Sequence, residues 1–347
     1  MNLEERINSF SDLGDILRNT LEGKGGSYEE HLNNLVVSQE KYNQFFTPLN
    51  VRMAVKAIAD ELTYDNLKQW TDAYPALSEP FKPYKTGVIM AGNIPLVGFH
   101  DFLSVLISGN NIIAKTSSKD AELIVYLGEI LCSLNPGFRE KISFTDGLLK
   151  DFDAVIATGS DNSSRYFEYY FGKYPHIIRK NRNSIAVIEG SETDSELENL
   201  GTDVFSYFGL GCRNVSKVYL PEGYNIHTFI KNWDRYSDVI NHSKYANNYE
   251  YNMAVYLVNK ENFLDTGYLL LKESPRLSSP VSVLYYEFYN SEDRLSSLII
   301  NLQEKIQCVC GKKYITFGKA QFPKLWDYAD NIDTLDFLLK KNLSGIM

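Results

Sequence analysis

Apolar residues recur at helical intervals in the first part of the chain. Within NVRMAVKAIADELTYDNLKQW they stand three or four residues apart, as on one buried helix face. These positions are Val51, Val55, Ile58 and Leu62. We therefore predict that residues 1–80 are mainly helical, with Pro48 at a helix opening. The two prolines of EPFKPYK (79–85) interrupt the pattern and predict a boundary.

From Lys85 onward, short apolar runs alternate with longer stretches suited to buried helices. The predicted strands are GVIMAG, NNIIAKT, ISFTDG, DAVIATG, HIIRK and SIAVIEG. Helices are expected over PLVGFHDFLSVLIS, over KDAELIVYLGEILCSL and over about residues 163–173. Strands that alternate with helices of this length indicate βαβ units and a parallel sheet.

A second α/β pattern begins near residue 191. Its expected helices are DSELENLGTDVFSYFG and SEDRLSSLIINLQ, and its expected strands are VSKVYLPEG, MAVYLVN, PVSVLYYEF, IQCVCG and YITFG. We therefore predict two α/β domains, residues 1–190 and 191–347, with a cleft between them. Ligands of open α/β sheets bind at the carboxyl ends of strands.

Composition narrows the class of protein. The 347 residues are 44% hydrophobic, and 35 Lys+Arg against 44 Asp+Glu give a net charge of −9, which argues against a nucleic-acid or anionic-membrane partner. No apolar run reaches the roughly 18 residues of a membrane span, and the acidic N-terminal stretch lacks a secretory signal. Four cysteines are too few for a disulfide framework, so a cytoplasmic location is expected.

The common motifs of nucleotide and metal sites are absent, so single residues must carry any chemistry. Cys212 lies between an expected helix and strand, where Gly209 and Gly211 permit a sharp bend. The alternative is a buried structural thiol, as free cysteines often are. Cys308 and Cys310 are interpreted as packing residues, and no His or Cys accompanies them at zinc spacing, so no metal site is expected.

Two further groups follow predicted strands. Asn93, in GNIPL, is suited to donate to an oxyanion, but asparagine also caps helices for its own reasons. Lys115, followed by Ser117 and Ser118, is placed to reach a ribose or phosphate. Its alternative is an ordinary solvated lysine that precedes a helix-capping serine.

Thr158, Gly159 and Ser160 stand before an expected helix, where free N–H groups suit a pyrophosphate, although simple capping explains them too. In their order along the chain, these groups and Cys212 resemble the aldehyde dehydrogenase superfamily, over about residues 85–325. GNIPLVGFHD, the Gly-x-Gly-Cys-Arg-Asn stretch and FGKAQFPKLWDYAD look most similar to its acyl-CoA reductase branch, which includes the fatty-acid reductase of bacterial bioluminescence.

The resemblance implies an aldehyde-dehydrogenase-like fold of two parallel-sheet α/β domains with the active site in the cleft between them. Residues 1–190 would hold the helical N-terminal region and the dinucleotide-binding domain, and 191–347 the catalytic thiol domain with a C-terminal segment. Cys212 would be the nucleophile and Asn93 an oxyanion donor. The cofactor would be held by Lys115, Ser118, Thr158, Gly159 and Ser160. A homo-oligomer is also implied.

Two departures from the oxidising relatives bear on the reaction. Arg179, in RKNRNSIAV, stands where those enzymes carry the glutamate that activates water, and a permanently protonated arginine cannot act as a base. Ser118 stands where NAD-preferring relatives carry a glutamate, so NADPH is favoured and NADH remains open. RLSSPV also lacks the later ribose-binding glutamate.

The sequence therefore predicts an NAD(P)H-dependent reductase that converts an acyl-CoA to an aldehyde through an acyl-cysteine. Two alternatives remain: another activated donor such as an acyl phosphate, or a nucleotide-binding scaffold without turnover. For His100 and Asp101, a core role is favoured over a proton relay, because adjacent residues of a helix point in different directions.

Overall fold

The chain forms two compact units that differ from the expected division. The computed structural model describes residues 1–80 and 82–343. One unit comprises Met1–Lys180 together with the chain from Lys324 onward, and the other comprises Asn181–Pro323. The change of unit therefore falls before the expected boundary at residue 190, and the C-terminal segment returns to the first unit. The reason is that the strand Asn183–Val187 pairs within the sheet of the second unit.

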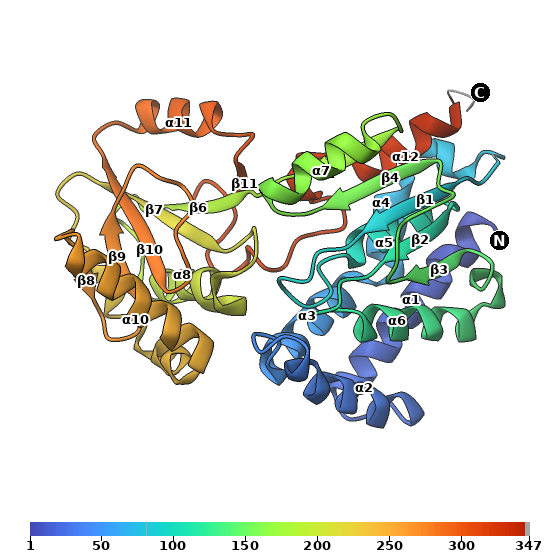
Figure 1. The fold of residues 1–347 in the computed structure, drawn as a ribbon, viewed down its shortest axis with the longest axis horizontal. Helices are drawn as coiled ribbons and strands as arrows, with labels where there is room; N and C mark the ends of the chain where they lie inside the picture. The colour runs from blue at the N-terminus through green and yellow to red at the C-terminus, as the bar shows by residue number, and fades with distance from the viewer. Residues whose placement is uncertain (81, 344–347) are drawn as a thin grey trace. The chain divides into compact units, whose positions relative to one another are not determined.

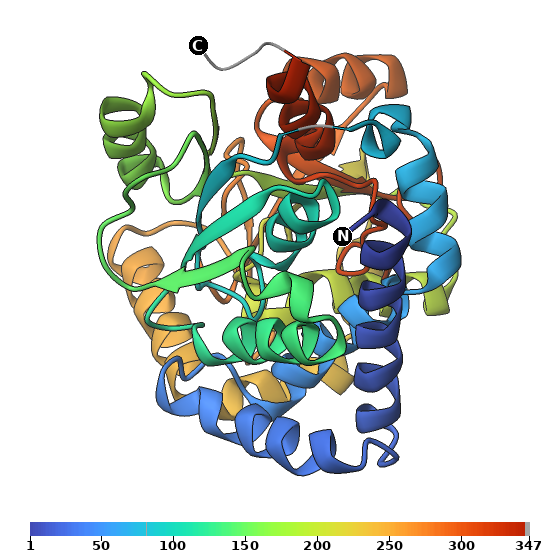
Figure 2. The same ribbon diagram turned by 90° about the vertical axis from the view of Figure 1, so that its right-hand side faces the viewer.

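The N-terminal region is helical, as predicted. Its helices are α1 (Leu3–Leu21), α2 (Ser27–Ser38), α3 (Pro48–Glu61) and α4 (Tyr64–Asp72). Pro48 is the first residue of α3, and the Thr47 side chain caps that helix. The stretch with the helical apolar spacing contains two helices, because Thr63 caps a new helix, α4, by accepting from the Asn66 N–H. Helix α1 packs against α3 and α6 (Figures 1 and 2).

The first unit contains a fully parallel five-stranded sheet in the order β3-β2-β1-β4-β5. Its strands are β1 (Lys85–Ile89), β2 (Asn111–Lys115), β3 (Ile142–Thr145), β4 (Ala154–Thr158) and β5 (His176–Arg179). The helices α5 (Phe99–Ile107), α6 (Glu122–Leu134) and α7 (Asp161–Phe171) follow β1, β2 and β4. Val88, Ala114 and Ile156 place the three central strands in the core. The βαβ prediction is confirmed.

A buried ion pair joins three elements of this unit. Arg179, at the end of β5, forms a salt bridge with Asp101 on α5, and both side chains are almost inaccessible to solvent. The Arg179 guanidinium also donates to Thr334 Oγ1 at 2.9 Å. Thr334 is the first residue of α12 (Thr334–Leu343), which packs against α5. Arg179 thus binds the returning C-terminal segment to the sheet.

His100 faces a different set of partners from its neighbour Asp101. Its Nε2 lies 2.8 Å from the Leu325 carbonyl oxygen, and its ring packs on Trp70 and Tyr328. Trp70 Nε1 in turn donates to the Tyr328 hydroxyl at 2.8 Å. His100 therefore holds the returning chain against the helical region, which fits a core role.

The second unit is built on a six-stranded sheet in the order β11-β6-β7-β10-β9-β8. Its strands are β6 (Asn183–Val187), β7 (Val215–Pro221), β8 (Leu264–Asp265), β9 (Leu270–Glu273), β10 (Val283–Tyr289) and β11 (Ile306–Cys310). All pairs are parallel except β8 with β9. Its α-helices are α8 (Asp194–Phe205), α9 (His227–Ile230), α10 (Ser243–Val258) and α11 (Glu292–Asn301).

Alternating residues of β6 and β7 serve opposite faces of this sheet. Ala186 and Val218 belong to a core cluster with Leu200 of α8. Ile185 and Tyr219 belong to another cluster with Leu295 of α11. Figure 1 shows α11 on one side of the strands and α8 on the other. Because helices cover both faces of the sheet, consecutive residues in the middle of these strands, 185–187 and 218–220, are hydrophobic.

Two predicted strands of this unit are wrong. MAVYLVN lies within α10, whose buried residues Tyr245, Tyr249, Asn252 and Tyr256 recur at helical spacing. A short apolar run alone does not distinguish a strand from a buried helix segment. YITFG forms only an isolated bridge, between Ile315 and Cys310. Strand β9 and helix α12 were not predicted.

Replacing Arg179 with methionine is expected to destabilise the first unit by about 3–5 kcal/mol, because Asp101 would remain as a buried charge without its partner. Urea unfolding followed by circular dichroism measures the loss. The double variant Arg179→Met/Asp101→Leu should recover most of it, since no lone charge is left. Equal stability of the single variant and the wild type would show that the pair contributes nothing.

Candidate functional site

Three loops of the first unit leave the same edge of its sheet. Strands β1, β2 and β4 are neighbours and run parallel, so their carboxyl ends lie together. The last residues of β2 and β4 are the predicted residues Lys115 and Thr158, and the loops that follow the three strands carry Asn93, Ser118 and Gly159–Ser160. Ligands of open parallel sheets bind at this edge. The structure therefore brings six of the seven predicted site residues to one edge of one unit.

The Asn93 loop lies close to the loop after β2. A Cβ atom on Gly92 would stand 2.3 Å from Ser117 Oγ, so only glycine permits this approach. The Asn43 side chain donates to the Gly92 carbonyl at 3.2 Å and holds the loop from the other side. Asn93 itself is exposed. Helix α5 is capped by Gly98, so the capping alternative for Asn93 does not apply.

Lys115 spans from β2 to the loop after β3. Its ammonium donates to the carbonyl oxygens of Asp146, at 2.8 Å, and of Gly147. Ser118 is exposed. Helix α6 begins after Ala121, and no side chain caps it. Lys115 is therefore not the lysine before a capping serine that the alternative assumed.

Gly159 and Ser160 form the turn that opens α7. A Cβ atom on Gly159 would lie 2.8 Å from the Phe167 ring and 2.9 Å from Ser163 Cβ, so the turn requires glycine. Ser160 Oγ accepts from the Ser163 N–H at 3.3 Å and caps the helix. Capping and anion binding are compatible here, because the other N–H groups of a first helical turn have no intrahelical acceptor.

Cys212, the seventh predicted residue, belongs to the second unit. It is half-buried, in contrast to Cys308 and Cys310, which are buried as expected for packing residues. The loop before it bends sharply, with positive φ angles of 52° at Tyr207, 57° at Phe208 and 76° at Gly209. The fully buried thiol of the alternative interpretation is not observed.

Asn214 braces this loop and was not predicted. The side chain is buried, and its Oδ1 accepts from the Gly211 N–H at 2.8 Å. Its Nδ2 donates to the carbonyl oxygens of Ser206, at 2.8 Å, and Asp203, at 3.0 Å. One asparagine thus satisfies backbone groups on both sides of the turn and fixes the backbone that carries Cys212.

Ser184 supports Cys212 from β6. Its hydroxyl donates to the Cys212 carbonyl at 2.9 Å and accepts from the Cys308 N–H at 3.2 Å. The Cys308 thiol lies 3.0 Å from the same hydroxyl. A hydrogen bond with Cys310 lowers the pKa of the Cys308 thiol and raises that of Cys310. The three strands β6, β7 and β11 therefore meet behind the predicted nucleophile.

Asp203, on α8, completes the support of this region. Burial raises the pKa of its carboxyl group to about 6, although two backbone hydrogen bonds oppose the shift. The donors are the Gly318 N–H at 2.6 Å and the Ala320 N–H at 3.0 Å. Asp203 therefore fixes the segment after β11 beside the helix that leads to the Cys212 loop.

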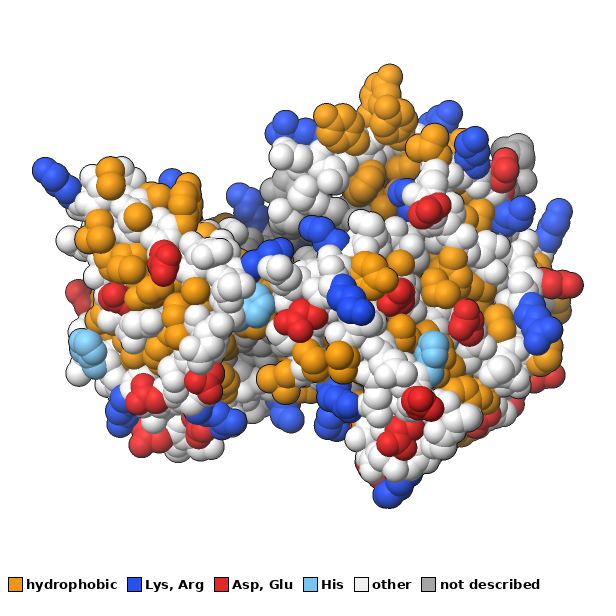
Figure 3. Space-filling model, turned by 60° about the horizontal axis from the view of Figure 1, so that its bottom comes forward, with side chains coloured by type: hydrophobic (Ala, Val, Ile, Leu, Met, Phe, Trp, Pro, Cys, Tyr) orange, Lys and Arg blue, Asp and Glu red, His pale blue; other side chains and the backbone are white. Residues whose placement is uncertain are grey.

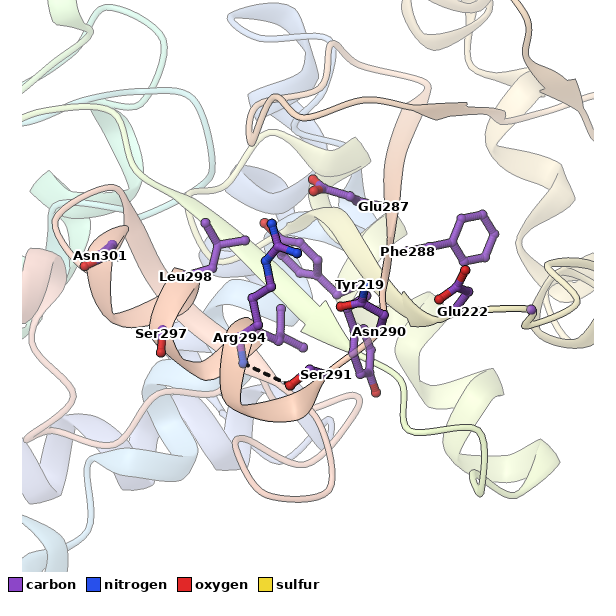
Figure 4. A pocket seen from close by; sticks show the side chains of 13 residues that line it. Tyr219, Glu222, Glu287, Phe288, Asn290, Ser291, Arg294, Ser297, Leu298 and Asn301 are labelled. Carbon is purple, nitrogen blue, oxygen red and sulfur yellow. Dashed lines mark hydrogen bonds between the residues drawn. The ribbon is translucent and has the colours of Figure 1, made fainter.

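A cavity of about 660 Å³ lies elsewhere in the second unit, at the carboxyl ends of β7 and β10 and beside α11. Figure 4 shows Arg294 and Glu287 at this cavity, with Tyr219 and Asn290 nearby. Glu287 forms a salt bridge with the buried Lys217. Cys212 precedes β7, whose seven residues span roughly 20 Å at about 3.3 Å per residue. The cavity is therefore separate from the thiol.

Other chemical features are limited in the described part of the chain. Residues 1–80 and 82–343 contain no helix long and apolar enough to cross a membrane. Among the same residues, no group of three or more His, Cys, Asp or Glu side chains is placed to hold a metal ion. On the face shown in Figure 3, basic and acidic side chains are interspersed.

Comparison with known proteins identifies the family. Residues 24–231, more than half of the chain, match the acyl-CoA reductase (LuxC) family. The chain belongs to this family. A long-chain acyl-protein thioester reductase of Aliivibrio fischeri is 26% identical over 204 residues, which are 53% of this chain and 42% of that protein. The match thus spans less than half of the relative's length.

Solved structures with the same fold are aldehyde dehydrogenases. Aldehyde dehydrogenase 21 of Physcomitrella patens, in complex with succinate, has a TM-score of 0.67 at 11% sequence identity. The match covers 99% of this chain and 85% of the dehydrogenase chain. An NAD+ complex of a Bacillus cereus aldehyde dehydrogenase has a TM-score of 0.61 at 13% sequence identity, and the match covers 89% of this chain and 72% of the dehydrogenase chain. The aldehyde-dehydrogenase-like fold predicted for this LuxC-family chain is confirmed.

Replacing Asn214 with alanine is expected to lower the free energy of unfolding by about 1–3 kcal/mol, because buried backbone groups would lose their partners. Hydrogen exchange should also accelerate at Gly211, whose N–H bonds to the lost oxygen. Asn241→Ala, at an exposed position, is the control and should change neither quantity. Unchanged exchange at Gly211 in the Asn214 variant would contradict the bracing role.

Proposed function

We propose that this LuxC-family chain reduces the acyl group of an acyl-CoA to an aldehyde, with NADPH as the hydride donor and Cys212 as the nucleophile. The observation that carries the proposal is the setting of Cys212. It is a half-buried thiol on a glycine turn whose backbone is fixed by Asn214 and Ser184. A nucleophile benefits from such a fixed position because the entropic cost of alignment is met in advance by the fold.

The first step is acyl transfer to the protein. The Cys212 thiolate attacks the thioester carbonyl, a new C–S bond forms, and the bond to CoA sulfur breaks. CoA leaves as a thiolate that takes up a proton. One thioester replaces another, so the acyl group stays activated. The Asn93 side-chain N–H and the Cys212 backbone N–H would stabilise the oxyanion, and losing one such donor typically costs about 10²–10³ in rate.

The second step returns the thiol. When bound, a reduced dinucleotide would supply the hydride that reduces the carbonyl carbon of the acyl-Cys212 thioester. The oxyanion left on that carbon would collapse to the aldehyde as the C–S bond breaks, and Cys212 would return as the thiolate. Arg179 supports this course over hydrolysis. In the sequence it stands where oxidising relatives carry the glutamate that activates water, and a guanidinium that stays protonated and is held by Asp101 and Thr334 does not act as a base.

The carboxyl edge of the first sheet fits a dinucleotide. The turn before α7 requires glycine at position 159, and the first turn of α7 offers N–H groups to a phosphate. Ser118 is exposed and uncharged beside Lys115. A carboxylate at this position would repel a 2′-phosphate, whereas a hydroxyl does not. NADPH is therefore the proposed donor, and NADH is the alternative.

A protein-bound acyl thioester is the second candidate donor. The relative in Aliivibrio fischeri is described as a reductase of long-chain acyl-protein thioesters. The chemistry at Cys212 is the same whether the departing sulfur belongs to CoA or to a protein. An acyl phosphate would replace that sulfur by a phosphate oxygen. Offering each donor together with NADPH and following absorbance distinguishes them, and no turnover with any donor would favour a scaffold.

Mixing the protein with acyl-CoA in the absence of dinucleotide should add the mass of one acyl group. Intact-mass spectrometry after Cys212→Ser substitution should show no adduct that hydroxylamine removes at neutral pH. Cys132→Ser is the control, because Cys132 is also half-buried but lies on α6 of the first unit. It should acylate like the wild type. A labile adduct that persists in the Cys212 variant would rule out this nucleophile.

Introducing a carboxylate by Ser118→Glu is expected to raise KM for NADPH at least about 10-fold, because the charge repels the 2′-phosphate at short range. KM for NADH should change little or fall. Ser118→Ala, which adds no charge, serves as the control and should keep the wild-type preference. Equal effects of the glutamate on both cofactors would place the 2′-phosphate elsewhere.

A further inference from the structure

A buried carboxyl group stands behind the Asn93 loop. Asp120 follows β2 and comes just before α6, where an aspartate is expected to cap the helix. It does not do so, since α6 has Ala121 at its cap position and no side-chain bond there. The Asp120 carboxylate instead accepts from the Leu96 N–H at 2.7 Å. The side chain is 4% exposed.

Leu96 is the point where the Asn93 loop turns into α5. Its φ angle is 57°, in the left-handed region that residues other than glycine rarely adopt. Its carbonyl oxygen accepts from the Phe99 N–H at 2.9 Å, at the start of the helix. Because the Leu96 N–H is bonded to Asp120, the carboxyl group holds this unfavourable turn in place. Asn93 lies three positions before Leu96.

Among the residues that the structure describes, no cation forms an ion pair with Asp120. Burial raises the pKa of its carboxyl group to about 7, and only the Leu96 N–H opposes the shift. Its Oδ1 is buried and has no partner among the described residues. On its own segment, Lys119 is exposed and Glu122 binds Gln39 and Tyr42.

The charged groups of the neighbouring elements are engaged elsewhere. From β2, Lys115 donates to two carbonyl oxygens of the loop after β3. From α5, Asp101 pairs with Arg179, and the His100 ring contacts the Leu325 carbonyl. The hydrogen bond to Leu96 is thus the principal contact through which Asp120 acts on its surroundings.

We propose that Asp120 is a positioning residue for Asn93, and that the ionised carboxylate holds the Asn93 loop more firmly than the neutral acid does. The physical reason is that an ionised acceptor forms a stronger hydrogen bond with a backbone N–H than a neutral one. The contribution to turnover rests on the proposed function, because it requires Asn93 to stabilise the oxyanion. The contribution to loop geometry does not.

A nuclear magnetic resonance titration of the full chain tests the loop directly. In the wild type, the Leu96 amide and the Asn93 side-chain amide should shift with one shared midpoint near neutral pH. In Asp120→Asn, which keeps an oxygen acceptor but does not ionise, both titrations should vanish. Asp65→Asn, at an exposed position of α4, should leave them unchanged. A Leu96 titration that survives in Asp120→Asn, or an Asn93 amide that never shifts, would overturn the proposal.

Kinetics tests the consequence for turnover. Asp120→Ala should lower kcat roughly 10-fold or more, approaching the loss of an oxyanion donor, with less than about a 3-fold change in KM for acyl-CoA. In Asp120→Asn, kcat should match the wild type at pH 6 and fall below it at pH 8, because the wild-type carboxylate is then ionised. Wild-type kcat at pH 8 in both variants would contradict the positioning role. Should the alanine variant not fold, Asp120→Asn carries the test.

The pH dependence of stability provides a third test, because the direction of the change is defined. Because the folded state raises the pKa of Asp120, it retains a proton that the unfolded chain releases between about pH 4 and pH 7. The contribution of Asp120 to the free energy of unfolding therefore falls as pH rises through that window. In Asp120→Asn, the free energy of unfolding should fall less steeply over the same pH range. If the wild type reduces no acyl donor, the proposed function fails, while the titration and the stability slope still decide the role of Asp120 in the loop.

Discussion

The parallel pairing of β2, β1 and β4 is the constraint on which the candidate site in the first unit depends. Each strand ends at the same edge, so three loops that are distant in sequence meet there. The close approach of two of them demands a small residue, as at Gly92 against Ser117. Polar residues that look ordinary one at a time become a candidate site because the direction of the strands gathers them.

The sequence predicted this part of the fold well because its signals are local. The strands around Val88, Ala114 and Ile156 are short apolar runs, each followed by a longer stretch suited to a helix. Residues 253–259 are also apolar, but they continue a helix whose earlier turns are largely polar, so the local signal was misleading. The return of the chain at Lys324 left no signal in periodicity, because it depends on contacts with Trp70 and Arg179 far away in sequence.

The supporting residues were missed for a similar reason. Ser184 lies 28 positions from Cys212 and 124 from Cys308, and only the strand order β11-β6-β7 brings the three together. Asp120 would be interpreted from sequence as a helix cap, yet its carboxyl group turns to Leu96. Residue types indicate what a side chain is able to bond, whereas the partner it finds is decided by the packing of distant segments.

The discontinuity of the first unit has a consequence for how the chain is made. Everything from Asn181 to Pro323 is inserted between β5 and the segment that carries Tyr328 and Thr334. A ribosome therefore finishes the inserted unit before its host receives the last helix. Until the segment after Pro323 emerges, Arg179 lacks Thr334 and Trp70 lacks the Tyr328 hydroxyl. During synthesis the first unit therefore stays incompletely packed until its C-terminal segment is made. Chaperones commonly engage newly made proteins in such an incompletely folded state.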